Sequence, residues 1–206
     1  MQRTVWSGQV KWFWPLFSIL LAALWVGLIV ADGFTREDHL LGQHLHEAQG
    51  QLALLGLLLL LISRPLAPWV PQLLQERRWL GLLTFGFALT HGVGAYNHSL
   101  GGRWDGLLFL DPWLQATVVL GGVSLVLLVP LALTSFDYAV RALGRLWNKL
   151  HRLILPAAIL AVVHTLGSGI DYFNTPQTEP TRILASVGLL LGVGLVVWFR
   201  PNKNTL

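Results

Sequence analysis

Long apolar runs separated by short polar connections dominate the chain. Six of these runs reach the roughly 20 residues that an α-helix needs to cross the hydrocarbon core of a bilayer. Their approximate bounds are 12–31, 44–62, 79–97, 112–133, 150–169 and 183–199. The pattern predicts an all-α fold, in which residues 1–206 form one polytopic membrane domain built as a six-transmembrane-helix bundle. No segment has the length and polarity of a soluble domain.

The basic residues predict how this bundle is oriented. With both termini on the cytoplasmic side, all but three of the 14 Lys and Arg residues fall on that side, the exceptions being Arg36, Arg103 and Arg182. All but two of the 10 Asp and Glu residues, Glu76 and Asp137, fall on the outer side. Because Lys and Arg in short loops set membrane topology, we expect this orientation.

Composition agrees with a membrane protein and removes several kinds of chemistry. Charged residues make up 12% of the chain, against roughly 25% in soluble domains. The chain has no Cys, which excludes disulfides, iron–sulfur clusters, thiolate nucleophiles and c-type heme attachment. The net charge of +4 is spread over separate loops, so we expect membrane lipid as a partner and no nucleic acid.

Residues 135–149 are amphipathic. Ser135 is the expected N-cap of a helix, and Arg141, Arg145 and Lys149 recur at i, i+4 and i+8. Such a helix would lie with its apolar side against the lipid surface. An ordinary cytoplasmic connecting helix is an equally good interpretation.

Two histidines lie well inside apolar runs, where ionisable residues are rare and usually functional. His91 lies 13 residues after Arg78, and His164 lies 14 residues after Leu150. Each is therefore about 20 Å into its helix, so the two imidazoles are expected at the same level in the outer half of the membrane. Two neutral imidazoles facing each other across a bundle are what bis-His ligation of heme iron requires.

His151 is expected near the inner surface. It precedes His164 by 13 residues, roughly 20 Å along the helix. A second heme there would need a ligand 13 residues before His91, where the chain has Arg78, which is not a usual iron ligand. Two interpretations stay open for His151, an iron ligand or an interfacial residue near lipid phosphates or a quinone head group.

The remaining histidines lie in or next to the predicted outer loops. They are His39, His44, His46 and His98. Their spacing matches no compact metal motif, and they are expected either to be solvated or to line an outer quinone, propionate or partner-docking surface. Arg103 is the basic residue best placed to pair with outward-pointing heme propionates.

Several motifs resemble the ferric reductase-like transmembrane family, and within it the heme-binding membrane subunits of periplasmic methionine sulfoxide reductase systems. The resemblance extends from about Gly50 to the end of the fifth predicted span. The motifs are Pro65-Leu66-Ala67, Arg77-Arg78-Trp79-Leu80-Gly81-Leu82, Ala88-Leu89-x-His91, Thr134-Ser135, Leu143-Gly144-x-x-Trp147-x-x-Leu150-His151-Arg152-Leu153 and Val163-His164.

The resemblance implies a b-type cytochrome of the bacterial inner membrane or a thylakoid-type membrane. Such a protein takes electrons on the cytoplasmic side from a flavin such as FMN, or from a quinol, and delivers them to an acceptor protein at the outer face. The family's heme-binding histidines correspond to His91, His151 and His164. The chain departs from the family at Glu47, where relatives often carry His and where His46 is the adjacent residue, and at Thr165, where many carry an aromatic residue. One heme is favoured because the third span has no second His, and two remain possible.

These observations predict a redox subunit without catalytic residues of its own, with substrate chemistry on a partner. The chain ends soon after Arg200, so we expect electrons to come from a separate donor. Two alternatives remain. One is an accessory or structural subunit of a larger redox or photosynthetic membrane complex, and the other is a proton or metal transporter that uses the intramembrane histidines. The predicted spans contain almost no Asp or Glu for a proton relay, which disfavours the transporter.

Overall fold

The computed structural model describes residue 23 and residues 41–168, apart from the side chains of residues 41–45 and 98, and the regular structure of this part is entirely helical. The longer helices are α2 (Leu41–Leu66), α4 (Arg77–Gly94), α5 (Pro112–Leu133) and α8 (Ile154–Ser168). Short elements connect them: α3 (Pro71–Gln75), the π-helical η1 (Ala95–Ser99), the 3-10 helix η2 (Trp104–Phe109), α6 (Asp137–Leu143), α7 (Arg145–Leu150) and the 3-10 turn η3 (His151–Leu153). Both termini and the predicted sixth span lie outside the described residues. So does the predicted first span, apart from residue 23.

Three of the described helices are long and apolar enough to cross a membrane. They run over His46–Leu66, Pro112–Leu133 and Arg145–Ser168, close to the predicted spans 44–62, 112–133 and 150–169. The predicted span 79–97 coincides with α4, which is not among the three. Its 18 residues include Arg77 and Arg78 in the first turn as well as four glycines, and these lower its mean hydropathy.

Local chemistry explains where several helices begin. The side chain of Asp111 accepts a hydrogen bond from the backbone N–H of Trp113, and Pro112 occupies the first helical position of α5, where a missing N–H costs nothing.

The expectation of one helix capped by Ser135 is wrong. The Ser135 hydroxyl donates to the carbonyl of Leu131, and Gly144, with φ of +49°, divides the segment into α6 and α7.

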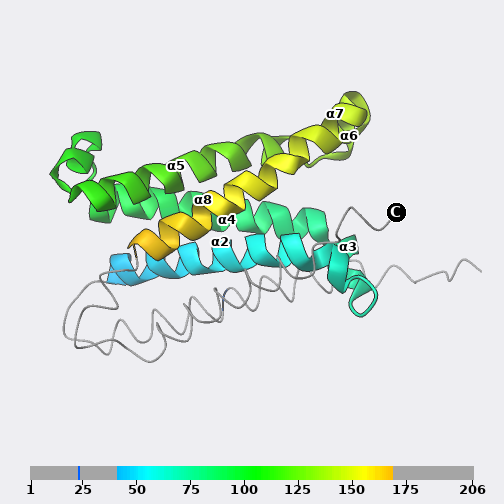
Figure 1. The fold of residues 1–206 in the computed structure, drawn as a ribbon, viewed down its shortest axis with the longest axis horizontal. Helices are drawn as coiled ribbons and strands as arrows, with labels where there is room; N and C mark the ends of the chain where they lie inside the picture. Colours follow the sequence, from blue (N-terminus) through cyan, green and yellow to red (C-terminus); the bar gives the residue numbers. More distant parts are fainter. Residues whose placement is uncertain (1–22, 24–40, 169–206) are drawn as a thin grey trace, which may run out of the picture.

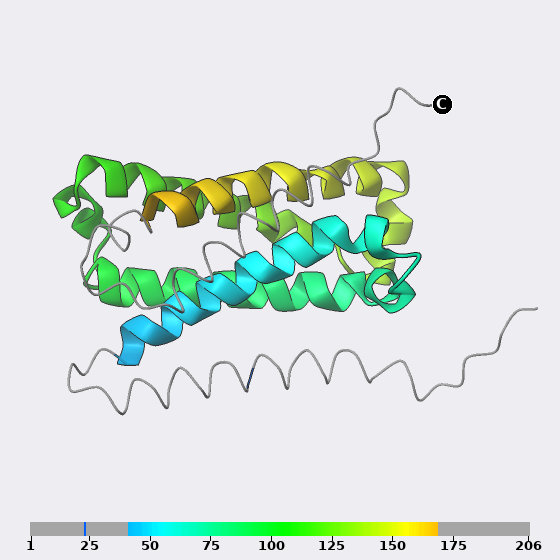
Figure 2. The same cartoon turned by 60° about the horizontal axis from the view of Figure 1, so that its bottom comes forward.

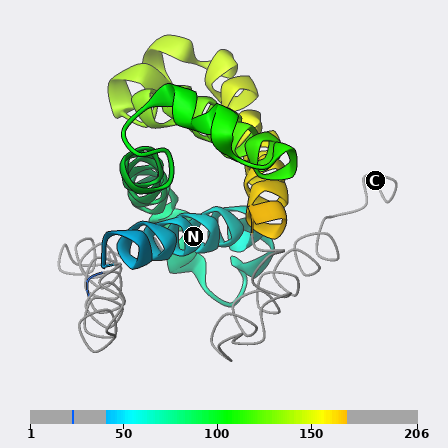
Figure 3. The ribbon, with the colours of Figure 1, turned by 90° about the vertical axis from the view of Figure 1, so that its left-hand side faces the viewer.

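The four long helices form a ring in the order α2, α4, α5, α8, with α4 and α8 facing each other across it (Figure 3). α2 crosses obliquely between α4 and α8 (Figure 2). One end of the bundle carries α3, α6 and α7, and the other carries the connection from α4 to α5 (Figure 1). Given the predicted orientation, we call these the inner and outer ends.

Small residues let the helices approach closely. Ala157 is completely buried, and the hydroxyl of the buried Ser124 on α5 donates to its carbonyl on α8 at 2.8 Å. Gly56 of α2 lies directly against the Thr84 side chain of α4. Small side chains and interhelical hydrogen bonds are the usual means of helix association in lipid, where burial of apolar surface between helices gives little driving force.

Candidate functional site

Three histidines from three helices meet toward the outer half of the bundle. The rings of His91 on α4 and His164 on α8 have their centroids 6.0 Å apart. The ring of His46, near the start of α2, lies 5.8 Å from that of His91. The meeting of His91 and His164 expected from their matched depth is therefore present in the structure.

Hydrogen bonds from neighbouring helices orient the two central imidazoles. The Nδ1–H of His91 donates to the backbone carbonyl of His46 at 2.6 Å, and the Nδ1–H of His164 donates to that of Thr117 at 2.8 Å. Because a carbonyl can only accept, Nδ1 carries the proton in each neutral ring. The lone pair then lies on Nε2. A metal-binding histidine whose Nδ1–H donates to a backbone carbonyl adopts this same tautomer.

Glycines make room for both rings. A Cβ atom at Gly50 would lie 2.8 Å from Nδ1 of His91, and one at Gly121 would lie 2.9 Å from Nδ1 of His164. A side chain at either position would displace the imidazole beside it. Gly94 makes the same allowance for the side chain of His46.

This arrangement fits the ligand set of a heme. Two neutral imidazoles from facing helices, each with Nε2 free of a proton, are the donor set that would hold heme iron. Within residues 41–168 no group of three or more His, Cys, Asp or Glu side chains is placed to hold a metal ion.

Sequence reasoning missed the position of His46. His46 is predicted to lie in or next to an outer loop, whereas in the structure it is only 6% exposed. The available signal was helical spacing, because His46 lies one turn before Gly50 and two turns before Leu54, on the buried face of α2. Extending that face backward by one turn would have placed His46 in the bundle.

The other predicted site residues lie apart from this cluster. His151 stacks on Trp147, with ring centroids 3.9 Å apart, and its Nδ1–H donates to the Trp147 carbonyl. Arg78 pairs with Asp137, and Arg103 makes a two-bond ion pair with Asp105 at the outer end. The structure therefore brings together His91 and His164, but not His151, Arg78 or Arg103.

Charged groups at the inner end perturb one another. The Arg78 guanidinium holds the pKa of the Asp137 carboxyl below its usual value, with a smaller contribution from Arg141. Partial burial lowers the pKa of Arg77, and the nearby Arg64 lowers it further. The inner end is thus strongly basic.

Comparison with known proteins finds one matching family and several full-length relatives. The family described as ferric reductase like transmembrane component matches residues 48–162. Three relatives carry the name protein-methionine-sulfoxide reductase heme-binding subunit MsrQ. The protein from Brucella anthropi is 34% identical over 98% of this chain and 88% of its own length. The protein from Enterobacter sp. (strain 638) is 31% identical over 93% of each chain. The protein from Cronobacter sakazakii is 36% identical over 93% of this chain and 92% of its own length.

Proposed function

Because this chain belongs to the ferric reductase-like transmembrane family, we propose that it is a b-type cytochrome subunit that relays electrons outward across a bacterial inner or thylakoid-type membrane. The proposal includes six membrane-spanning helices in a single domain over residues 1–206, with both termini on the cytoplasmic side. The observation that carries it is the pairing of His91 and His164, each in the tautomer that leaves Nε2 open to a metal.

The protein's part in this function is to hold and orient the cofactor. His91 and His164 would hold the heme iron through their Nε2 atoms, and the carbonyls of His46 and Thr117 fix their rings. When bound, heme supplies an iron centre that gains and loses one electron. Heme held by two imidazoles would be better suited to electron transfer than to oxygen chemistry.

The direction of transfer is argued from topology and from the relatives. We propose a flavin or quinol donor on the basic inner side and a protein acceptor at the outer face, as expected for a heme-binding subunit of a methionine sulfoxide reductase system. No residue of this chain is proposed as catalytic toward a final substrate.

The inner-end residues bear on the proposed number of hemes. His151 is the candidate ligand for a second heme, but Arg78, the residue that corresponds in depth on α4, is occupied by its ion pair with Asp137. One heme at His91 and His164 is therefore the favoured stoichiometry. Arg103, paired with Asp105, remains the candidate partner for an outward-facing propionate.

The absorption spectrum of the purified protein tests the proposal. We expect a reduced-minus-oxidised α band in the wild type that is lost in His91→Ala and in His164→Ala. Thr90→Ala and Thr165→Ala are matched controls, because each neighbours one of the two histidines and its hydroxyl bonds only to its own helix.

Each outcome of this experiment has a defined meaning. A normal α band in both histidine variants would contradict the ligand assignment. Absence of a Soret band in the wild type would favour the accessory-subunit alternative. A ratio near two hemes per polypeptide, falling to one in His151→Ala, would show that the inner-end site is also filled.

A further inference from the structure

An apolar groove with one basic side chain opens on the surface of the inner end. It is lined by Leu143, Leu146, Lys149, Leu150 and Leu153. These residues come from α6, α7 and η3, the elements that lead into α8. Leu146 is 60% exposed, so the groove presents hydrocarbon side chains to the surroundings.

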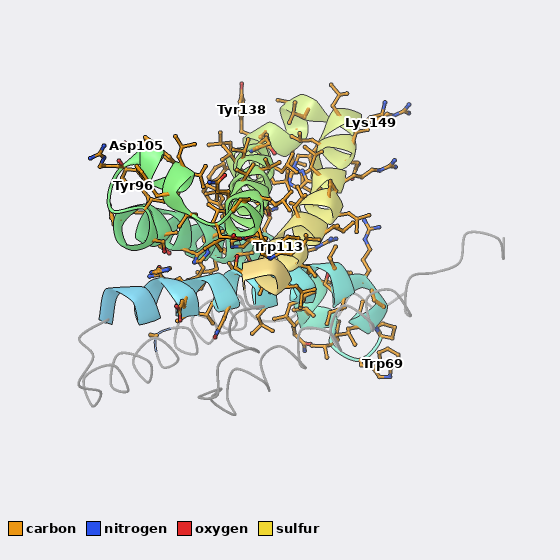
Figure 4. The ribbon with its side chains drawn as sticks, turned by 60° about the vertical axis from the view of Figure 1, so that its left-hand side comes forward. Trp69, Tyr96, Asp105, Trp113, Tyr138 and Lys149 are labelled. Carbon is orange, nitrogen blue, oxygen red and sulfur yellow. The ribbon has the colours of Figure 1, made fainter. Side chains whose placement is uncertain are left out.

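The groove lies where a membrane-crossing helix begins. The candidate span Arg145–Ser168 starts within it, so its leucines lie at the level where the acyl chains of a bilayer meet the head groups. Figure 4 shows Lys149 on the surface at this end of the molecule, far from Tyr96 and Asp105 at the opposite end. Long basic side chains at such a level extend their charged groups toward the head groups.

The charge around the groove selects the kind of lipid. Arg141, Arg145, Lys149 and Arg152 are all exposed. Asp137 is the one acidic residue between Thr134 and Ser168, and it is engaged by Arg78. The groove therefore combines a hydrophobic surface with an excess of basic over acidic side chains around it, the combination that binds anionic phospholipid.

We propose that this groove binds one anionic phospholipid of the inner leaflet, with an acyl chain against the four leucines and the phosphate at Lys149. The site is separate from the histidine cluster and does not depend on heme. The groove lies on the segment that also carries Trp147 and His151, and the Trp147 indole N–H ties this segment to the end of α5 by donating to the carbonyl of Thr134.

Native mass spectrometry of the purified full-length protein tests the proposal. The protein is titrated with phosphatidylglycerol or with phosphatidylcholine of the same acyl chains. We expect tighter binding of phosphatidylglycerol, and a loss of roughly fivefold in its affinity in Lys149→Gln, the effect of one basic residue at an anionic lipid surface. Leu146→Gln is expected to weaken both lipids.

Arg64→Gln is the matched control. Arg64 is an exposed basic residue at the inner end of α2 and does not line the groove, so its loss should leave lipid binding unchanged. Equal affinity for the two lipids would overturn the proposal, as would equal losses in Lys149→Gln and Arg64→Gln. Displacement of the lipid by an equal concentration of inorganic phosphate would also overturn it, because the acyl chain would then contribute nothing.

Discussion

At the scale of single residues, the candidate site depends on glycines, whose lack of a side chain leaves room for the histidine rings. Gly50 and Gly121 lie against the imidazoles of His91 and His164, so the absence of a side chain at each position permits the observed ring orientation. Each ring is also held by a carbonyl from another helix. The orientation of the two imidazoles therefore depends on glycines and on backbone carbonyls, which are not themselves candidate metal ligands.

Gly121→Ala tests this dependence, with Gly122→Ala as its control. The new methyl group at residue 121 would lie 2.9 Å from Nδ1 of His164, whereas one at residue 122 meets nothing within 4 Å. We expect Gly121→Ala to weaken the hydrogen bond from His164 to Thr117 and to lower heme per polypeptide or shift the α band. Gly122→Ala should leave both measurements at wild-type values. Identical spectra for the two variants would show that the imidazole tolerates the displacement.

At the scale of elements, the bundle consists of two closely packed helix pairs. α2 packs along α4, and α5 packs along α8, with fewer contacts between the pairs. Buried small and polar residues lie at these contacts, among them Ser124 and Ala157 between α5 and α8 and Thr84 against Gly56 between α2 and α4. His164 and its partner Thr117 belong to the same helix pair, so the α5–α8 contact also positions that ligand candidate.

Ser124→Ala measures the contribution of the interhelical hydrogen bond. Bonds of this kind in membrane proteins average about 0.6 kcal/mol, and we expect a loss of that order in the free energy of unfolding, measured by denaturant titration in detergent. Ser63→Ala is the control, because Ser63 is equally buried but its hydroxyl donates within its own helix, to Leu60. A larger loss for Ser63→Ala than for Ser124→Ala would contradict this account of the α5–α8 contact.

At the scale of the whole molecule, an ion pair at the inner end links α4 to the short helix α6 that follows α5. Arg78 lies in the first turn of α4 and Asp137 begins α6, and their side chains bond to each other although they are 59 positions apart in sequence. At the outer end Arg103 and Asp105 are only two positions apart, so their ion pair joins nothing distant. Of these two ion pairs, only the inner one links segments that are distant in sequence.

Asp137→Asn is expected to lower the melting temperature near neutral pH, with Asp105→Asn as the control of smaller effect. The pKa of Asp137 is lowered in the folded protein, chiefly by Arg78. The ion pair therefore contributes stability above the usual Asp pKa of about 4 and loses it as pH falls through the lowered folded value. The difference in melting temperature between Asp137→Asn and the wild type should shrink over that range. A difference independent of pH would mean that the carboxylate charge is not the cause.

Much of the fold followed from the linear pattern alone. Apolar length located α2, α5 and α8 to within a few residues, because a helix that must satisfy its backbone in lipid needs a run of set length. Equal depth along two helices was enough to predict that His91 and His164 meet, since rise per residue converts spacing into distance. The division of residues 135–149 was not predicted, because the amphipathic spacing continues through Gly144 and carries no sign of the positive φ at that residue.

What the sequence determined by itself is a helical membrane protein of this family with paired intramembrane histidines, because hydropathy, charge bias and helix rise are properties of the chain read in order. Tertiary structure alone decided that His46 joins the cluster, that Nδ1 of each central imidazole bonds a carbonyl from another helix, and that Arg78 binds Asp137. These are contacts between residues 45 to 59 positions apart. They depend on which faces of the helices meet, and that is set by packing across the ring.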